Sequence, residues 1–284
     1  MNSQSLTELS QDELKSIEIN ILNEIDEVCR TNGIRYSLAY GTLLGAVRHK
    51  GFIPWDDDRD ILMPRYDYNR FLDFCKNHET NFQIKSFSFD SNYAYTFAKA
   101  CDMRTLLIEK YTNRYEAEIG VYIDIFPIDP IPGDLDKAVK CFKKKEFQRD
   151  LIVASNWKKF QSKKENSIIR ESARFIFFVL SRFSNIKSLL NDVETFYTSF
   201  EWDKCEYAGN VVDGTWGTRN VMPKSIFERY CELLFEGRKY LCIAEYDSFL
   251  ANIYGNYMEL PPEDKRVTHH TFSAYWKNDI LGAE

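Results

Sequence analysis

The sequence has no apolar run that approaches the roughly 18 residues needed for a membrane-spanning helix. Residues 1–12 also lack the basic start and the apolar stretch of a secretory signal peptide. These absences exclude the common signals for insertion and export. We therefore expect a soluble protein that is not secreted by that route.

Cysteine-based metal and disulfide motifs are missing as well. The seven cysteines are scattered along the chain, and no two of them form a CxxC pair. An odd number of scattered cysteines indicates neither a disulfide framework nor a zinc cluster. We therefore expect the reducing cytoplasm as the compartment.

The chain as a whole has no excess of positive charge. Its 37 Lys and Arg residues are outnumbered by 43 Asp and Glu residues, which gives a net charge of -6. A nucleic-acid-binding surface generally needs the opposite balance, so we expect no nucleic-acid partner. Hydrophobic residues make up 44% of the 284 positions, enough to bury a core in one α/β domain, or in one with an insert.

Apolar periodicity predicts the order helix, mixed sheet, helical block, further sheet and closing helix. The clearest element is an amphipathic helix at 10–32, with a capping box formed by Ser10 and Glu13 and a stop at Gly33. The other predicted elements are strands at 34–39, 58–63, 82–89, 93–101, 105–110, 119–126 and 207–212, a short helix at 41–47, a helix capped by Asp67, a hairpin at 230–242 that turns at Glu236 and Gly237, and a helix at 243–254. We predict one domain over residues 1–284, with a core at about 30–130 and 205–270 and a helical insert at about 134–204.

Positive charge is concentrated in the predicted insert. Residues 137–174 contain 12 Lys or Arg and 4 Asp or Glu, a local charge of +8 that leaves about -14 for the rest of the chain. The apolar segment 175–180, too short to span a bilayer, follows directly. Two interpretations remain open: peripheral contact with an anionic membrane, or a solvated helix face with a core segment behind it.

The densest functional signal is acidic. Four acids fall within five residues: Asp56, Asp57, Asp58 and Asp60. On a strand, residues two apart point the same way, so Asp58 and Asp60 would share a face and repel by about 4 kcal/mol at 4 Å and an effective dielectric near 20. A divalent cation removes that repulsion, and oxygen ligands without nearby Cys or His favour Mg²⁺ or Mn²⁺ over zinc. The alternative is a solvated acidic loop.

Before these acids, the Gly41-Thr42 turn offers backbone N–H groups at the start of a short helix, where phosphate can bind. A strand, a Gly-Thr turn, a helix and an Asp-x-Asp strand are the arrangement of the nucleotidyltransferase superfamily. The segments 41–58 (GTLLGAVRHKGFIPWDDD) and 63–68 (MPRYDY) resemble the LicD family, whose relatives include fukutin and the fukutin-related protein. The resemblance continues at 121–129 (VYIDIFPID), 253–258 (IYGNYM) and 260–262 (LPP). It extends from about residue 30 to residue 270, and the basic block matches least.

This resemblance implies a nucleotidyltransferase-like mixed sheet flanked by helices, with a basic helical insert. It also implies transfer of a phospho-alcohol, usually phosphocholine, from a CDP-activated donor to a cell-surface glycan or its lipid-linked precursor, with release of CMP. By position, Asp58 and Asp60 resemble the paired metal carboxylates, and Asp124 resembles the third acid on the adjacent strand. Asp124 is also a candidate to receive the proton of the attacking sugar hydroxyl.

Arg59 departs from the family pattern, which usually has an apolar residue between the two acids. The choice between Asp56/Asp58 and Asp58/Asp60 as the metal pair therefore stays open. The zinc-binding cysteine insert of the fukutin-related protein has no counterpart here.

The predicted donor site consists of Gly41, Thr42 and two candidate phosphate clamps, Arg48 and Lys99. Each cation could equally be an ordinary surface charge, and Arg65 could simply form an ion pair with Asp67. The 43 aromatic residues could supply a cage for a quaternary ammonium group, but their spacing identifies no particular ring.

Two other functions remain open: transfer of the nucleotide itself to a small acceptor, and Ca²⁺-dependent glycan binding without catalysis. The adjacent His269 and His270 are left unassigned, because neighbouring residues on a strand point in opposite directions.

Overall fold

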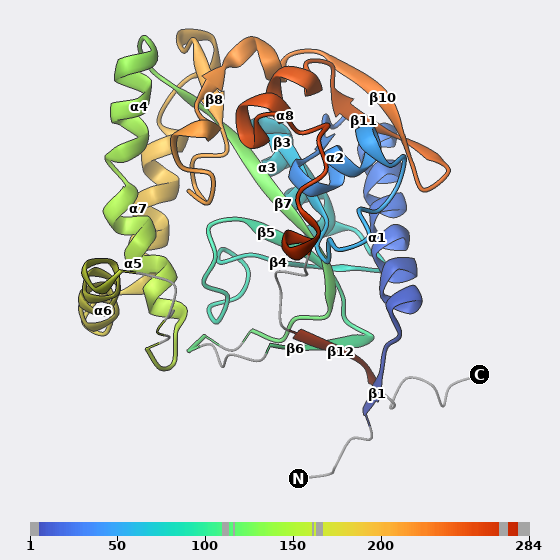
Figure 1. The fold of residues 1–284 in the computed structure, drawn as a ribbon, viewed down its shortest axis with the longest axis horizontal. Coiled ribbons are helices and arrows are strands. Elements are labelled where there is room, and N and C mark those ends of the chain that lie inside the picture. Colours follow the sequence, from blue (N-terminus) through green and yellow to red (C-terminus); the bar gives the residue numbers. More distant parts are fainter. Residues whose placement is uncertain are drawn as a thin grey trace.

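The computed structural model describes residues 6–109, 114–115, 117–160, 162, 167–266 and 272–277. It is a mixed α/β fold in which a curled mixed sheet is flanked by helices (Figure 1). The helices are α1 (Gln11–Asn32), α2 (Tyr40–Arg48), α3 (Arg65–Asn77), α4 (Leu135–Lys143), α5 (Glu146–Asn156), α6 (Ile168–Ser181), α7 (Ile186–Thr198) and α8 (Tyr246–Tyr254). The strands are β1 (Leu6–Glu8), β2 (Ser37–Leu38), β3 (Asp60–Pro64), β4 (Gln83–Lys85), β5 (Ala98–Asp102), β6 (Thr105–Glu109), β7 (Val121–Ile131), β8 (Tyr207–Gly209), β9 (Met222–Pro223), β10 (Tyr230–Phe235), β11 (Arg238–Ile243) and β12 (Phe272–Lys277).

The main sheet has the strand order β2-β3-β7-β5-β4, and β8 with β9 extends it from the far end of β7. Strands β3 and β7 are parallel, and the other neighbours pair antiparallel. A smaller sheet has the order β1-β12-β6, and β10 pairs with β11 in a hairpin. The sheet therefore places two strands that are far apart in the sequence, β3 and β7, side by side at its centre.

Helix α1 begins and ends as its sequence predicts. Ser10 Oγ accepts a hydrogen bond from the Glu13 N–H at 3.3 Å, and the Glu13 carboxylate accepts one from the Ser10 N–H at 2.8 Å. At the other end Gly33 adopts φ 59°, the left-handed conformation that closes helices. The predicted hairpin is also confirmed, since Glu236 and Gly237 both have positive φ between β10 and β11.

Strand β7 is longer than the sequence predicts, because it continues through Pro127 and Pro130 instead of ending there. The Asp124 N–H points toward β3, where it donates to the Arg59 carbonyl at 2.8 Å. By alternation, the ring nitrogen of Pro127 is on the β5 side, where pairing has already ended at Ile125. The ring nitrogen of Pro130 is on the β3 side, beyond the last paired residue, Ile128. Neither proline therefore removes a donor from the ladder with β5 or with β3.

Several predicted strands are shorter in the structure. The segments 34–39, 82–89, 93–101 and 207–212 are strands only in β2, β4, β5 and β8. Strand β3 starts at Asp60, where its pairing with Asp124 begins, so Asp58 precedes the strand. Asp67 is not a helix cap, because α3 already begins at Arg65 and Asp67 lies in its first turn.

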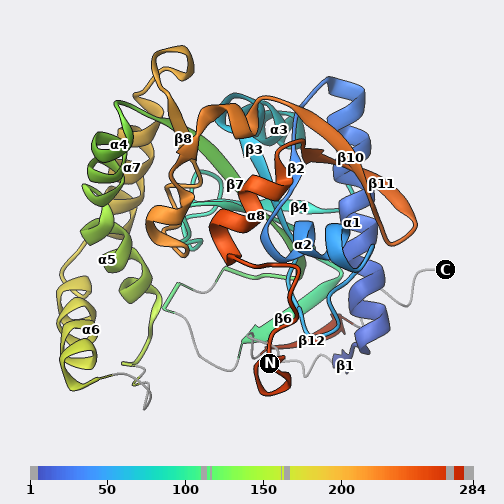
Figure 2. The same cartoon turned by 45° about the horizontal axis from the view of Figure 1, so that its top comes forward.

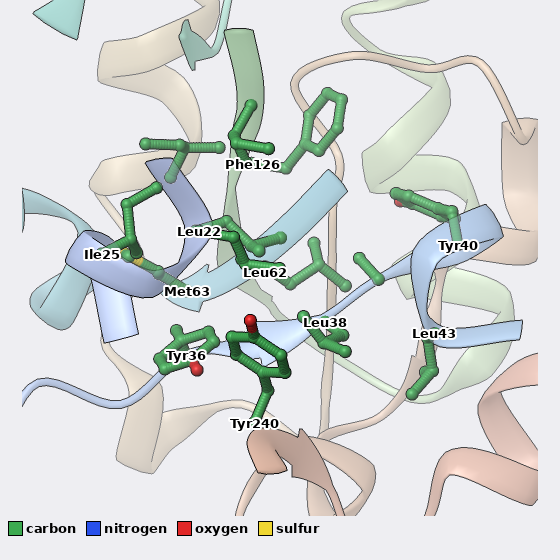
Figure 3. Packing of buried hydrophobic residues seen from close by; sticks show 14 of the residues in the cluster. Leu22, Ile25, Tyr36, Leu38, Tyr40, Leu43, Leu62, Met63, Phe126 and Tyr240 are labelled. Carbon is green, nitrogen blue, oxygen red and sulfur yellow. The ribbon is translucent and has the colours of Figure 1, made fainter. Parts of the chain in front are cut away.

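Two hydrophobic cores hold the molecule together. The larger core lies between the main sheet, α1, α2, α8 and the hairpin; Figure 3 shows Leu22 and Ile25 of α1 near Leu62 and Met63 of β3. The smaller core joins α4, α5 and α7 to the end of β7 and to the segment around Val211. Helices α4 to α7, within the predicted insert, lie together on one side of the sheet in both views (Figures 1 and 2). Within the described part of the chain, no helix is both long enough and apolar enough to cross a membrane.

Candidate active site

Three charged side chains form a row across the centre of the main sheet. Asp60 on β3 is the register partner of Asp124 on β7, and Asp124 is in turn the partner of Lys99 on β5. Register partners on adjacent strands lie about 4.8 Å apart and point to the same face. Lys99 Nζ lies 2.5 Å from Asp124 Oδ1. The sheet thus brings together two predicted acids and one predicted phosphate clamp.

Asp60 and Asp124 of this row lie at the floor of a cavity of about 820 Å³, and Lys99 stands beside Asp124 just behind the lining. Among the described residues, seven acids line the cavity: Asp56, Asp57, Asp58, Asp60, Asp124, Asp213 and Glu259. Burial raises the pKa of Asp60 well above its ordinary value, and the charges of Asp58 and Asp124 raise it further. The carboxylates therefore repel one another in a desolvated position, where a bound cation would be strongly favoured.

The position of Arg59 bears on whether Asp56/Asp58 or Asp58/Asp60 is the metal pair. Its side chain turns away from the cavity. Its guanidinium donates to Asp56 Oδ2 at 3.1 Å and lies 3.1 Å from the Glu18 carboxylate of α1. It also stacks over the Phe52 ring at 4.2 Å and is 98% buried. Arg59 therefore holds the acidic loop from the side away from the cavity, and one carboxylate oxygen of Asp56 is already bound to Arg59. Asp60 and Asp124 remain as the strand-borne pair.

The Glu18 carboxylate on the other side of Arg59 is also perturbed. Burial raises the pKa of Glu18 to about 7, against the attraction of Arg59 and with a further increase from Asp58, Asp56 and Asp57. Because the folded state holds the Glu18 proton more tightly than the unfolded state, protonation of Glu18 stabilises the fold. This contribution is complete below pH 4.5, the unfolded pKa, and is lost as the pH rises toward 7.

We therefore expect a pH-dependent stability difference between the wild type and Glu18→Gln. Relative to the variant, the free energy of unfolding of the wild type should fall by up to about 3 kcal/mol between pH 4.5 and about pH 7. Urea unfolding of both proteins in metal-free buffer across this range measures the difference. A constant difference would contradict a role for Glu18 titration.

Gly41 and Thr42 position the acids from the start of α2. A side chain at Gly41 would meet Asp56 Oδ2 at 2.6 Å, so only glycine lets the acidic loop approach this closely. Thr42 is buried behind the cavity, and its Oγ accepts the Asp60 N–H at 2.9 Å. Gly41 lines the cavity, whereas Thr42 lies behind it and fixes the backbone of Asp60 through this hydrogen bond. The first residue of α2, Tyr40, has φ 43°, and no side chain caps the helix.

Arg48, the other predicted clamp, lies at the rim of the same cavity. Its guanidinium donates to the carbonyl oxygens of Tyr257 at 2.7 Å and of Glu259 at 3.3 Å. Arg48 thereby ties α2 to the segment that closes the cavity near the C-terminal end of the chain.

The donor set suits Mg²⁺ or Mn²⁺ in chemistry, because it consists of carboxylate oxygens that repel one another. Among the residues that the structure describes, however, no three His, Cys, Asp or Glu side chains are arranged so that they could hold an ion directly. The Lys99 ammonium neutralises Asp124 instead. Asp60 and Asp124 would hold a cation only after Lys99 moves aside, with Asp58 as the loop-borne candidate for a third ligand.

An aromatic wall, which no sequence pattern had identified, lines the same cavity as the acids. It comprises Tyr40, Phe126, Trp216 and Tyr254. The Tyr40 and Trp216 rings stack with centroids 6.1 Å apart, and Trp216 meets Tyr254 edge-on at 4.9 Å. Burial and the nearby Asp60 charge raise the pKa of Tyr254. These rings come from four separate segments, so only the fold brings them together.

Arg65 lies outside this cavity, and its predicted ion pair with Asp67 is wrong. Arg65 binds Asp129 with two hydrogen bonds of 2.7 Å and reaches Glu194 of α7 at 2.6 Å. Asp67 instead pairs with Arg35 and Arg70. Arg65 therefore links the main sheet to the helical insert. His269 and His270 lie outside the described residues.

A parallel strand pair with facing carboxylates, a helix N-terminus beside them and a cavity over both define the catalytic class of a phosphate-transferring α/β enzyme. Comparison with known proteins specifies the family. Residues 33–164 match the nucleotidyltransferase domain model of LicD, FKTN and FKRP. The lipopolysaccharide cholinephosphotransferase LicD of Haemophilus influenzae is 34% identical over 278 residues, which cover 95% of this chain and 99% of that protein.

An uncharacterized protein of Rickettsia prowazekii is 29% identical over 112 residues, which cover 39% of each chain. The chain belongs to the LicD family and is a LicD-type phosphotransferase.

Proposed function

We propose that this enzyme transfers phosphocholine from CDP-choline to a hydroxyl group of a lipopolysaccharide-type surface glycan or its lipid-linked precursor, and releases CMP. The observation that carries the proposal is one cavity lined by Asp60, Asp124 and the aromatic wall, with Lys99 ion-paired to Asp124 behind it. The Haemophilus influenzae relative, whose name gives lipopolysaccharide and choline phosphate as its reactants, supports the same acceptor and the same group.

The charges of the cavity suit a donor that has an anionic diphosphate and a cationic head group. The uncapped start of α2 at Gly41 would offer backbone N–H groups to the diphosphate. The Lys99 ammonium, now paired with Asp124, would turn toward the donor phosphates when a cation takes its place on the carboxylate. Trp216 and Tyr254 would hold the trimethylammonium group by cation–π attraction.

In the reaction, an acceptor hydroxyl oxygen forms a bond to the phosphorus of phosphocholine while the bond from that phosphorus to the CMP oxygen breaks. Asp124 is the proposed acceptor of the hydroxyl proton, since its carboxylate lies at the cavity floor. Mg²⁺ or Mn²⁺ bound to Asp58, Asp60 and Asp124 would neutralise charge on the donor phosphates. Arg59 and Thr42 keep the acids in place for this chemistry.

A panel of CDP-choline, CDP-ribitol and CDP-glycerol tests the donor. Calorimetric titration in Mg²⁺ measures binding, and CMP is quantified after addition of a lipopolysaccharide acceptor. We expect CDP-choline to bind most tightly and to yield one CMP for each choline transferred. Absence of binding to all three would refute the donor proposal, and release of pyrophosphate would indicate nucleotidyl transfer instead.

If the aromatic wall binds the choline head group, the enzyme should distinguish donors by the positive charge of that group. Trp216→Ala should weaken CDP-choline binding by about 3- to 30-fold, the usual strength of a cation–π contact, and leave binding of neutral CDP-glycerol nearly unchanged. Trp202→Ala is the matched control, because Trp202 is half-buried outside this cavity, where Lys224 approaches it at 6.0 Å. Equal losses for both donors would assign Trp216 a purely structural role.

A further inference from the structure

Helix α6 exposes apolar side chains to solvent over most of its length. Ile168, Ile169 and Phe183, just past its end, are 86%, 84% and 87% exposed, and Phe175, Ile176, Val179 and Leu180 are also exposed. Its only buried residue is Ser181. Segment 175–180 is therefore not a core segment behind a solvated face, which corrects one of the two interpretations drawn from the sequence.

The exposed residues form one stripe. Ile168, Ile169, Ile176, Leu180 and Phe183 recur at the three- and four-residue steps, and their multiples, of a single helix face. Two charged groups of α6 face the protein instead: Arg174 pairs with Glu171 at 2.5 Å and stacks over Trp157 at 4.9 Å.

Arg182, at the end of α6, donates to the Ala154 carbonyl of α5 at 2.8 Å. The helix is thus held in place by polar contacts and by the Phe147–Phe177 ring contact at 5.3 Å, while its outer apolar face is left uncovered. Neither hydrophobic core includes a residue of α6 among the described side chains.

Positive charge accompanies this stripe. Residues 158–182 contain seven Lys or Arg and two Glu, a net charge of +5 in a chain whose total is -6. Lys158, Lys159 and Arg170 are exposed. The Phe160 ring lies 5.2 Å from the Phe175 ring, so the segment that follows Lys158 and Lys159 packs directly on α6. An apolar stripe with flanking cations complements an anionic lipid surface, whereas a second copy would bring like charges together.

A second cavity, of about 160 Å³, adjoins the catalytic cavity on the side of the insert. The two cavities share the lining residues Phe97 and Asp213. Trp157, which lines the second cavity, is the same ring over which Arg174 of α6 stacks. Trp157 therefore lies between this second cavity and α6.

We propose that α6 docks the enzyme on an anionic lipid bilayer, with its apolar stripe among the acyl chains near the headgroups and its neighbouring cations against the phosphates. The helix has 14 residues and lies along the surface without crossing it. The inference that docking brings a lipid-linked acceptor to the catalytic cavity rests on the proposed function. The docking itself does not depend on it.

Co-sedimentation with vesicles of phosphatidylglycerol and phosphatidylethanolamine, or of phosphatidylcholine alone, tests the docking. The wild type should bind the anionic vesicles, and the triple variant Ile169→Ser/Ile176→Ser/Phe183→Ser should bind at least about tenfold more weakly, since burial of each such side chain is worth about tenfold or more. The matched control Tyr66→Ser/Ile108→Ser/Leu135→Ser removes three exposed apolar residues elsewhere and should bind like the wild type.

Charge is tested separately. Changing Lys143, Lys144, Lys158 and Lys159 to Glu should abolish binding at low salt, whereas the same change at Lys76, Lys85, Lys204 and Lys239 should reduce it far less. Binding of the wild type should also weaken as the Debye length falls from about 10 Å at 0.1 M to about 3 Å at 1 M salt.

Equal binding by the wild type and the α6 triple variant would overturn the proposal. So would a wild-type dimer in light scattering that the triple variant converts to monomer, because a second copy would then cover α6. CMP release with a water-soluble acceptor should be unchanged in the triple variant. If the wild type also released no CMP with this acceptor, the proposed function would be refuted, but the conclusion from co-sedimentation that α6 docks on lipid would not be affected.

Discussion

Asp60→Asn and Asp124→Asn should each lower phosphate-group transfer by more than about 100-fold. Loss of a group that only orients a metal ligand typically costs about 10- to 100-fold, and these carboxylates lie in register at the cavity floor as the proposed ligands themselves. CMP release under saturating donor measures the loss. The control Asp73→Asn changes an exposed acid of α3 and should retain wild-type turnover.

In metal-free buffer, the melting temperatures of the Asp60→Asn and Asp124→Asn variants should shift in opposite directions. Asp60→Asn should raise the melting temperature, because burial and the neighbouring carboxylates raise the pKa of Asp60 and penalise its charge. Asp124→Asn should lower it, because Lys99 loses the carboxylate 2.5 Å from its ammonium. Near wild-type turnover in either variant would exclude that residue from the catalytic site.

Breaking the buried pair between Arg65 of α3 and Asp129 of β7 should produce the largest loss of stability. Arg65→Met and Asp129→Asn should each lower the free energy of unfolding by about 3–5 kcal/mol, since either change leaves a buried partner without its two hydrogen bonds. The double variant Arg65→Met/Asp129→Leu should recover most of this loss, because no charge then remains buried alone. Urea unfolding of the three proteins measures the effect.

Glu194→Gln is the control within the same network. Glu194 is a second partner of Arg65, and its side chain is 28% exposed, so water can compensate for its loss. We expect a cost below about 1 kcal/mol for this change. If Asp129→Asn cost no more than Glu194→Gln, burial of the Arg65–Asp129 pair would not be what stabilises this network.

The sequence predicts the parts of the fold and site that depend on short-range patterns. The capping box at Ser10 and the turn at Glu236 and Gly237 are local, and both are confirmed. The prediction that Asp124 lies on the strand beside Asp60 is also confirmed, because the resemblance supplied the strand order that spacing alone does not contain.

Other features depend on contacts between distant segments. The side chain of Arg59 turns toward Glu18, which lies 41 positions away, and Asp58 precedes strand β3. The rings of Tyr40, Phe126, Trp216 and Tyr254 meet only in the folded chain. An apolar run such as 175–180 normally indicates core, but α5 contacts only one side of α6, through Phe147 and Phe177, and leaves Phe175, Ile176, Val179 and Leu180 exposed.

Strand β7 constrains how members of this family can vary. Asp124 and Asp129 are five residues apart on an unbroken strand, so they point to opposite faces, one into the catalytic cavity and one toward Arg65. A single inserted or deleted residue between them would turn one of the two carboxylates to the wrong face. The separation of these two aspartates must therefore keep its odd value for one strand to serve both the catalytic cavity and the pair with Arg65.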